Sequence, residues 1–213
     1  MAELQKKILL IDTNCFIRLY FSPLLPLLGT EVAGYVLLTL DCLIDEFLNS
    51  SRLVTQYPWI SEEPRISDLN KAKLNLRKPT RTRVQTHSDE IRPYAKSLLE
   101  LYCQQRQITT RVLSSRDLEL LATTVTLKGA MATDEWPLRH VAEDLMDDPE
   151  EYDFELFNSL EVLHLLEKNA KLTPDERRAT VKSWLQNMEM LLKNWEIDYE
   201  RLFNEPSQTV KPN

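Results

Sequence analysis

The sequence predicts an α/β fold in which helices cover both faces of a mostly parallel sheet. Short apolar runs at residues 7–12, 35–40 and 130–133 suit buried strands, and they alternate with longer segments of helical periodicity. This alternation is typical of parallel strands joined by helical crossovers, in three layers. The chain has only three glycines in 213 residues, which argues against an all-β fold and against a glycine-rich phosphate loop.

The first part of the chain is expected to contain two strands. Residues 7–12 read KILLID, a run too short for a typical helix, so a buried strand is favoured. Residues 16–28 are apolar but contain two prolines, which indicates a helical turn followed by a loop. Residues 35–40 (YVLLTL) form either a second strand or the lead into a helix over residues 41–49, where Asp41 is placed as a cap.

The middle of the chain is expected to be largely helical. Residues 58–85 contain three prolines and many basic residues, so we expect a helix-containing insertion or a mobile segment. Residues 88–106 predict an amphipathic helix, because leucine and tyrosine recur at helical spacing. The next helix is expected to start at Ser114 or Ser115 and to end at Gly129, before the small-residue strand.

The last part of the chain predicts one more strand among helices. A short helix is expected over residues 138–146, and residues 154–166 should hold a strand and then a helix that begins near Ser159. Thr173 is followed by proline and two acids, which is a strong helix start. Its apolar face continues far enough to predict a single helix that runs past Trp195.

Four acids lie where these elements would bring them to the carboxyl edge of the sheet. Asp12 ends the first strand, and Asp134 follows the small-residue strand. Asp117 lies in the first turn of a helix, and Glu46 interrupts an apolar helix face, with Asp45 as its rival. The functional crevice of such sheets lies outside the carboxyl ends of the strands. Each acid alone has an ordinary explanation, as a helix-dipole partner, a turn residue or a solvated group, so their joint placement carries the inference.

The runs that hold these acids resemble the motifs of PIN-domain nucleases. ILLIDTNCFIRL, with Asp12, is similar to the family's opening strand and turn, and LTLDCLIDEF is similar to its second acidic position, which would be Glu46. SSRDLELLATTVTLKGAMATDEW resembles the segment with the third and fourth acids, which would be Asp117 and Asp134. SLEVLHLLEKNAKL resembles the closing strand and helix. The resemblance covers about residues 6–172.

This resemblance implies a domain organisation. Residues 1–172 would form a PIN-like three-layer α/β/α domain with a central, mostly parallel sheet. The basic stretch at about 58–85 would be an insertion, since it is longer than a minimal domain of this family needs. Residues 173–213 would form a C-terminal helical extension and tail.

The resemblance also implies a metal-dependent nuclease. Carboxylates prefer hard cations such as Mg²⁺ or Mn²⁺, whereas the three histidines have no zinc-ligand spacing. Asp12, Asp117 and Asp134 would be metal ligands, and Glu46 a ligand or the group that orients a water molecule. The residues expected to support them are four hydrogen-bonding side chains and one auxiliary acid: Thr13, Asn14, Ser114, Thr133 and Glu135.

Positive charge is concentrated in one stretch, although the net charge is −7. Between residues 65 and 83 there are seven basic residues and one acid. They could contact phosphates and make RNA binding depend on salt, with a solvated surface as the equal alternative. No aromatic residue is interleaved with them, so no base-stacking platform is predicted. The candidate nucleic-acid-binding residues are Lys71, Lys73, Arg77, Lys78, Arg81 and Arg83.

The expected function is RNA cleavage. Family likeness implies an endoribonuclease, acting as the toxin of a bacterial toxin–antitoxin pair with an antitoxin protein as partner. The alternatives are a non-catalytic PIN-like module that binds nucleic acid or protein, and a structural domain with surface acids. Three widely spaced cysteines and the absence of an apolar signal segment favour a cytoplasmic protein without a membrane span. The late apolar helix could also pack against a second subunit, which would make a homodimer.

Overall fold

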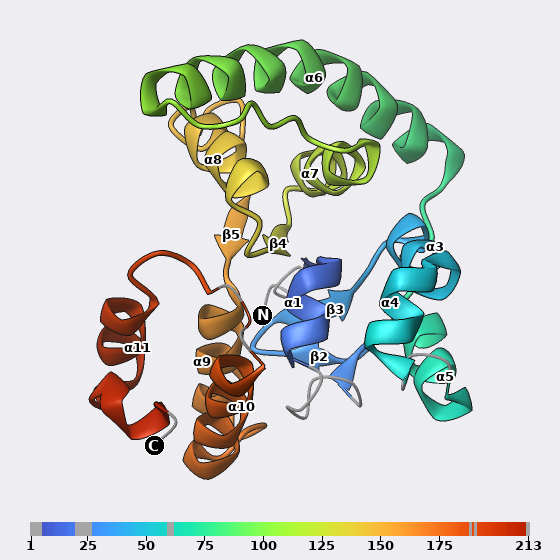
Figure 1. The fold of residues 1–213 in the computed structure, drawn as a ribbon. Coiled ribbons are helices and arrows are strands. Elements are labelled where there is room, and N and C mark those ends of the chain that lie inside the picture. The colour runs from blue at the N-terminus through green and yellow to red at the C-terminus, as the bar shows by residue number, and fades with distance from the viewer. Residues whose placement is uncertain (1–5, 20–26, 59–61, 188, 190, 212–213) are drawn as a thin grey trace.

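The protein is built on a five-stranded sheet with the strand order β2-β3-β1-β4-β5 (Figure 1). Four strands are parallel, and the short β2 pairs antiparallel with β3. The strands are β1 (Lys7–Ile11), β2 (Glu31–Val32), β3 (Tyr35–Leu38), β4 (Ala130–Ala132) and β5 (Glu155–Phe157). The computed structural model describes residues 6–19, 27–58, 62–187, 189 and 191–211. The predicted α/β fold with a mostly parallel sheet is confirmed.

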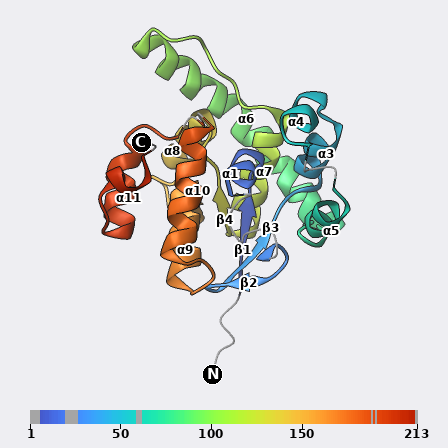
Figure 2. The same ribbon diagram turned by 60° about the horizontal axis from the view of Figure 1, so that its bottom comes forward.

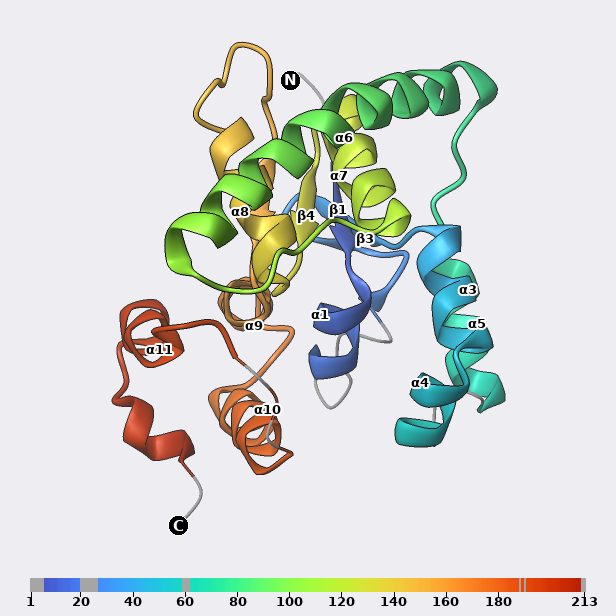
Figure 3. The same cartoon turned by 45° about the horizontal axis from the view of Figure 1, so that its top comes forward.

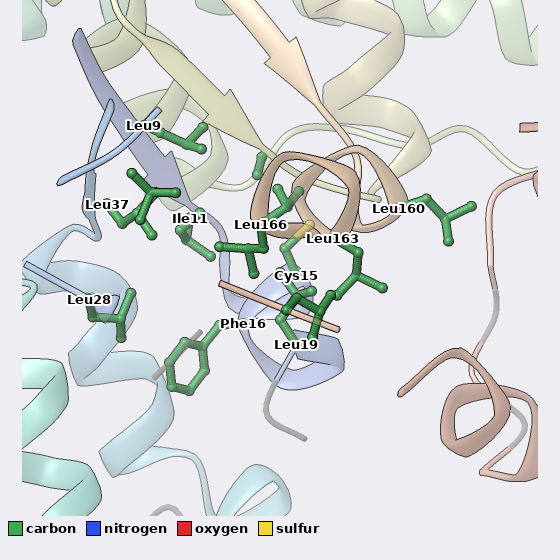
Figure 4. Packing of buried hydrophobic residues seen from close by; sticks show 14 of the residues in the cluster. Leu9, Ile11, Cys15, Phe16, Leu19, Leu28, Leu37, Leu160, Leu163 and Leu166 are labelled. Carbon is green, nitrogen blue, oxygen red and sulfur yellow. The ribbon is translucent and has the colours of Figure 1, made fainter. Parts of the chain in front are cut away.

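The central strand β1 is buried on both faces, which explains its uninterrupted apolar sequence. Leu9 and Ile11 point into one hydrophobic cluster, while Leu10 between them points into the other. Side chains alternate in the same way along β4, where Met131 shares the cluster of Leu10. Figure 4 shows the packing of the first cluster, in which Cys15 lies among the leucines.

One face of the sheet is covered by α6 (Lys78–Arg106), α7 (Ser115–Leu127) and α8 (Trp136–Leu145) (Figure 1). The long helix α6 begins ten residues before the predicted start at Ser88. Arg77 is its N-cap, and Pro79 lies in its first turn, where a missing N–H costs no helical hydrogen bond. The insertion expected at 58–85 therefore supplies the first turns of a core helix, although residues 59–61 lie outside the described part.

The other face is covered by α1 (Thr13–Arg18), α9 (Ser159–Lys168) and the C-terminal helices. The predicted helix from Thr173 past Trp195 is wrong in its length. Instead α10 (Pro174–Gln186) stops, and α11 (Trp195–Phe203) and a short 3-10 helix, η3 (Ser207–Val210), follow. Buried residues of all three C-terminal elements belong to the same cluster as β1: Val181, Trp184, Tyr199 and Val210.

Three further helices continue from the β3 side of the sheet, away from α11 (Figures 1 and 2). They are α3 (Asp41–Asn49), α4 (Ser51–Gln56) and α5 (Glu63–Lys71). The helix α3 inserts Ile44 and Phe47 into one cluster and Leu43 into the other, which fixes it against the sheet edge. None of the described helices is both long and apolar enough to cross a membrane.

Candidate active site

The carboxyl ends of β1 and β4 form the centre of the candidate site. β1 lies between β3 and β4, so the order of parallel strands reverses there, and ligands of open α/β sheets bind outside such a switch point. The pairing of Ile11 with Ala132 continues one residue further, where the Asp12 N–H donates to the Ala132 carbonyl at 3.0 Å. Asp12 and Thr133 therefore leave the sheet side by side.

Asp12 is buried at this edge, with only 4% of its surface exposed. One carboxylate oxygen accepts from the Thr13 backbone N–H at 2.7 Å, and the other accepts from the Thr133 hydroxyl at 2.7 Å. The pKa of Asp12 is raised to about 7. Burial is the largest cause, the charges of Glu135 and Asp117 act in the same direction, and the hydrogen bond from Thr133 acts against them. The carboxyl group is thus poised between its neutral and ionised forms near neutral pH.

Asp117 and Glu46 reach the same region from helices. Asp117 forms a capping box with Ser114, whose backbone N–H donates to Asp117 Oδ2 at 2.8 Å. Glu46 accepts from the Thr13 hydroxyl at 3.5 Å and pairs with Arg116 at 3.2 Å. Its rival, Asp45, is exposed and lines a neighbouring groove instead.

Asp134 does not join these acids. Its carboxylate forms a buried ion pair with Arg18 of α1 and accepts hydrogen bonds from the backbone N–H and the hydroxyl of Ser159, which begins α9. The Cys15 thiol lies 3.5 Å from the same carboxylate. The expectation that Asp134 faces the other three acids is therefore corrected, because it points between α1 and α9, where a guanidinium already offsets its charge.

Glu135, the residue after Asp134, is exposed, and its charge acts on Asp12. Partial removal from water raises the pKa of its carboxyl group, and the charges of Asp117 and Glu46 add to this effect, against the lowering effect of a hydrogen bond from Asn14. Asn14 also accepts from the Asp134 backbone N–H at 3.2 Å, which holds the turn after β4. Sequence reasoning named Glu135 only as an auxiliary acid, and no pattern separated it from its neighbour.

The acids form an open arrangement. Within the described residues, no three carboxylate, imidazole or thiol side chains are close enough to enclose a metal ion. Mg²⁺ does not require such a cage, because it keeps several waters and is usually held by one or two carboxylates together with substrate phosphates. The donor set fits that mode, since Asp12 and Glu135 offer carboxylate oxygens, and burial first and neighbouring acids second raise the pKa of both groups.

The basic stretch lies beside this edge. Two of its members are paired with acids, Lys71 with Asp68 and Lys73 with Asp41. Arg81 lines a cavity of about 510 Å³ between α3, α6 and α7, which Ser115 also borders. The other predicted phosphate-binding residues are exposed around the start of α6: Arg77, Lys78 and Arg83.

Comparisons with protein-family models, curated proteins and solved structures found no match to this chain. A functional assignment therefore rests on the site itself. Four acids of the site interact through their charges. Glu135 and Asp117 raise the pKa of Asp12, and Asp117 and Glu46 raise the pKa of Glu135.

The stability of the metal-free protein should fall as pH rises from about 4 to 7. Folded Asp12 titrates near 7 instead of 3.8, so between these values the folded state binds more protons than the unfolded state. The loss should approach about 4 kcal/mol when complete, and Glu135 contributes with the same sign. Urea unfolding in EDTA across this range tests it. Asp12→Asn should remove most of the slope, and an unchanged slope would contradict the assignment.

Proposed function

We propose that this protein is a Mg²⁺- or Mn²⁺-dependent endoribonuclease of the PIN type. The observation that carries the proposal is the buried Asp12 at the strand-order switch point, with the charges of Glu135 and Asp117 acting on it and that of Glu46 acting on Glu135. A buried carboxylate beside further acids favours a cation that offsets their charge, because each acid disfavours ionisation of its neighbours.

The residues of the site divide into two roles. Asp12, Asp117 and Glu135 would hold the cation, which when bound would lower the pKa of a coordinated water and offset charge on the phosphate. Glu46 is placed to accept a proton from the attacking water, since it lies at the same edge beside Thr13. Arg116, which pairs with Glu46 and is half-exposed, is placed to exchange that contact for a substrate phosphate.

The substrate path supports a nucleic acid. The 510 Å³ cavity is lined by Arg81 and Arg92 of α6 and extends to Ser115, next to Arg116, while Asp41, Asp45 and Glu119 line it as well. The groove is therefore mixed in charge, and the two arginines are the groups in it that could meet a phosphate backbone and make binding depend on salt. RNA, and the role of a toxin with an antitoxin partner, come from the resemblance to PIN-domain nucleases.

One observation favours a second candidate, a non-catalytic PIN-like module that binds nucleic acid or protein. The acid that resembles the family's fourth ligand, Asp134, is neutralised by Arg18 in the interior. A chain that had lost metal chemistry could keep such an ion pair for stability alone. Metal binding and cleavage distinguish the two candidates.

The test measures melting temperature and RNA cleavage with and without MnCl₂ or MgCl₂. A metal at 100 times its Kd should add about 2.7 kcal/mol, which raises the melting temperature by roughly 5–10 °C. A mixed-sequence single-stranded RNA should be cut only with metal, and EDTA should stop the reaction. RNA binding without a metal shift or cleavage would favour the binding module. The absence of binding, shift and cleavage would overturn both candidates.

A further inference from the structure

An aromatic cluster lies beside the candidate active site. Tyr102 of α6 packs against two residues of α8, with ring centroids 4.3 Å from His140 and 5.4 Å from Trp136. The guanidinium of Arg106 lies over the Tyr102 ring at 4.7 Å. All three aromatic residues are half-buried, so each keeps part of its surface at the solvent. More than thirty residues separate Tyr102 from the other two, which is why the sequence alone predicted no stacking platform.

These rings line a cavity of about 380 Å³, which we call the aromatic pocket. Its volume falls within the range of small-ligand sites, about 300–1,000 Å³. The other residues of its wall are of both charges: Arg201 pairs with Asp198 at 2.9 Å and Arg139 pairs with Glu143 at 3.1 Å, and Lys193 and Glu161 also line the pocket. Aromatic faces stack on unpaired bases whatever their sequence, so the rings are the part of this pocket that suits a nucleotide.

The aromatic pocket is joined to the acids by short covalent and hydrogen-bonded paths. Trp136 directly follows Glu135, so their Cα atoms are about 3.8 Å apart. Arg139, which also lines the pocket, donates to the carbonyls of Thr133 at 3.2 Å and Phe157 at 3.0 Å, at the ends of β4 and β5. Thr133 in turn donates to Asp12. Arg139 and Trp136 therefore tie the pocket wall to the strand ends that carry Asp12.

The long helix α6 connects the aromatic pocket with the groove of mixed charge. Its first half contributes Arg81 and Arg92 to the groove, and its last turns contribute Tyr102 to the pocket. Figure 3 shows α6 extending from above α7 to α8, with the carboxyl ends of the strands between them. A single strand that follows this helix would pass the acids between its contacts with the groove and the pocket.

We propose that the aromatic pocket binds one unpaired base of a single-stranded polynucleotide, next to the phosphodiester held at the acids. The choice of a polynucleotide rests on the proposed function, whereas the stacking itself requires neither metal nor cleavage. A base inserted against Trp136 and Tyr102 must leave its partner strand, so the pocket selects single strands over duplexes.

The test measures binding in EDTA, where no hydrolysis occurs. The probe is a 5′-fluorescein-labelled 12-nucleotide single-stranded RNA of mixed sequence, compared with the same backbone lacking its interior bases. Trp136→Leu and Tyr102→Leu should each weaken binding of the intact RNA by about 5- to 150-fold, as expected for the loss of one stacked base. Binding of the abasic strand should not change.

Two controls separate stacking from a folding defect. Tyr94→Leu removes an exposed tyrosine of the same helix that bonds Asp144 outside the pocket, and it should bind RNA as the wild type does. Trp136→Phe keeps an aromatic face and should retain most of the affinity. Equal losses for intact and abasic RNA, or no loss, would overturn the proposal. Base-dependent binding without metal-dependent cleavage would support the aromatic pocket and contradict the proposed nuclease function. Cleavage by the wild type, together with unchanged RNA binding by Trp136→Leu, would support the nuclease function and contradict the proposed role of the pocket.

Discussion

Replacing Asp12 with asparagine is expected to lower metal-dependent RNA cleavage by at least about 10³-fold, because a bound cation supplies several kcal/mol of transition-state stabilisation. The same change should stabilise the metal-free protein above pH 7 by up to about 4 kcal/mol, since it removes a buried charge that titrates near 7. The amide keeps the size of the carboxylate and can still bond the Thr13 N–H and the Thr133 hydroxyl. Cleavage of labelled RNA and urea unfolding in EDTA measure the two effects.

Asp45→Asn provides the matched control for this prediction. Asp45 is also an acid near the site, but it is exposed and faces the groove beside α3. Its replacement should change stability by no more than about 0.5 kcal/mol, and it should not lower cleavage, because it only removes a negative charge from the groove proposed for the substrate. If Asp12→Asn cut RNA as well as Asp45→Asn did, Asp12 would have no part in holding the metal.

The strands of this fold could be predicted because burial on both faces leaves a clear mark in the sequence. β1 and β4 appear as short apolar runs within a residue or two of their predicted bounds. The start of α6 was missed because the prolines and basic residues of 58–85 were interpreted as an insertion, whereas a proline in the first turn is compatible with a helix. Composition does not distinguish a proline in the first turn of a helix from a proline in a loop. Only the packing of the surrounding residues does.

The C-terminal region shows the limit of periodicity. Apolar residues continue at helical spacing from Val181 to Trp195, so one long helix was expected. The structure places Val181 and Trp184 in α10 and Trp195 at the start of α11, and leaves Leu191 and Leu192 in the segment between the helices. Asn194 adopts a left-handed conformation with φ of 68° before the second helix. Trp184 is held by a hydrogen bond to the Arg18 carbonyl. Two helices packed on one core carry the same apolar pattern as one straight helix, so the break depends on tertiary contacts.

At the site, a strand end and a helix start drew attention to Asp12 and Asp117, whereas Glu46, with Asp45 as its rival, came from its place in an apolar helix face and from the family resemblance. These features were not sufficient to choose between Asp134 and Glu135. Adjacent side chains after a strand point in different directions, and which of them faces inward depends here on Arg18, more than a hundred residues earlier in the chain. No local pattern contains that information.

Asp134→Asn is expected to lower the free energy of unfolding by about 3–5 kcal/mol, because it breaks a buried ion pair. Substitution of a solvent-facing metal ligand is not expected to have this effect. Arg18 would remain buried with its charge, and Glu189, at 3.8 Å, could replace only part of the lost interaction. Glu135→Gln should instead leave stability equal or higher, because it removes repulsion from Asp117, while it reduces cleavage. Urea unfolding in EDTA and metal-dependent cleavage should therefore respond oppositely to substitution of these two neighbours.

The double variant Arg18→Met, Asp134→Leu identifies the cause of the instability. Removing both charges should recover much of the loss seen in Asp134→Asn, since a buried ion pair can often be replaced by apolar groups of similar size. If Asp134→Asn kept wild-type stability but lost cleavage, Asp134 would have to leave Arg18 when metal binds. The ligand set would then be the one that the sequence resemblance implies, with Glu135 in support.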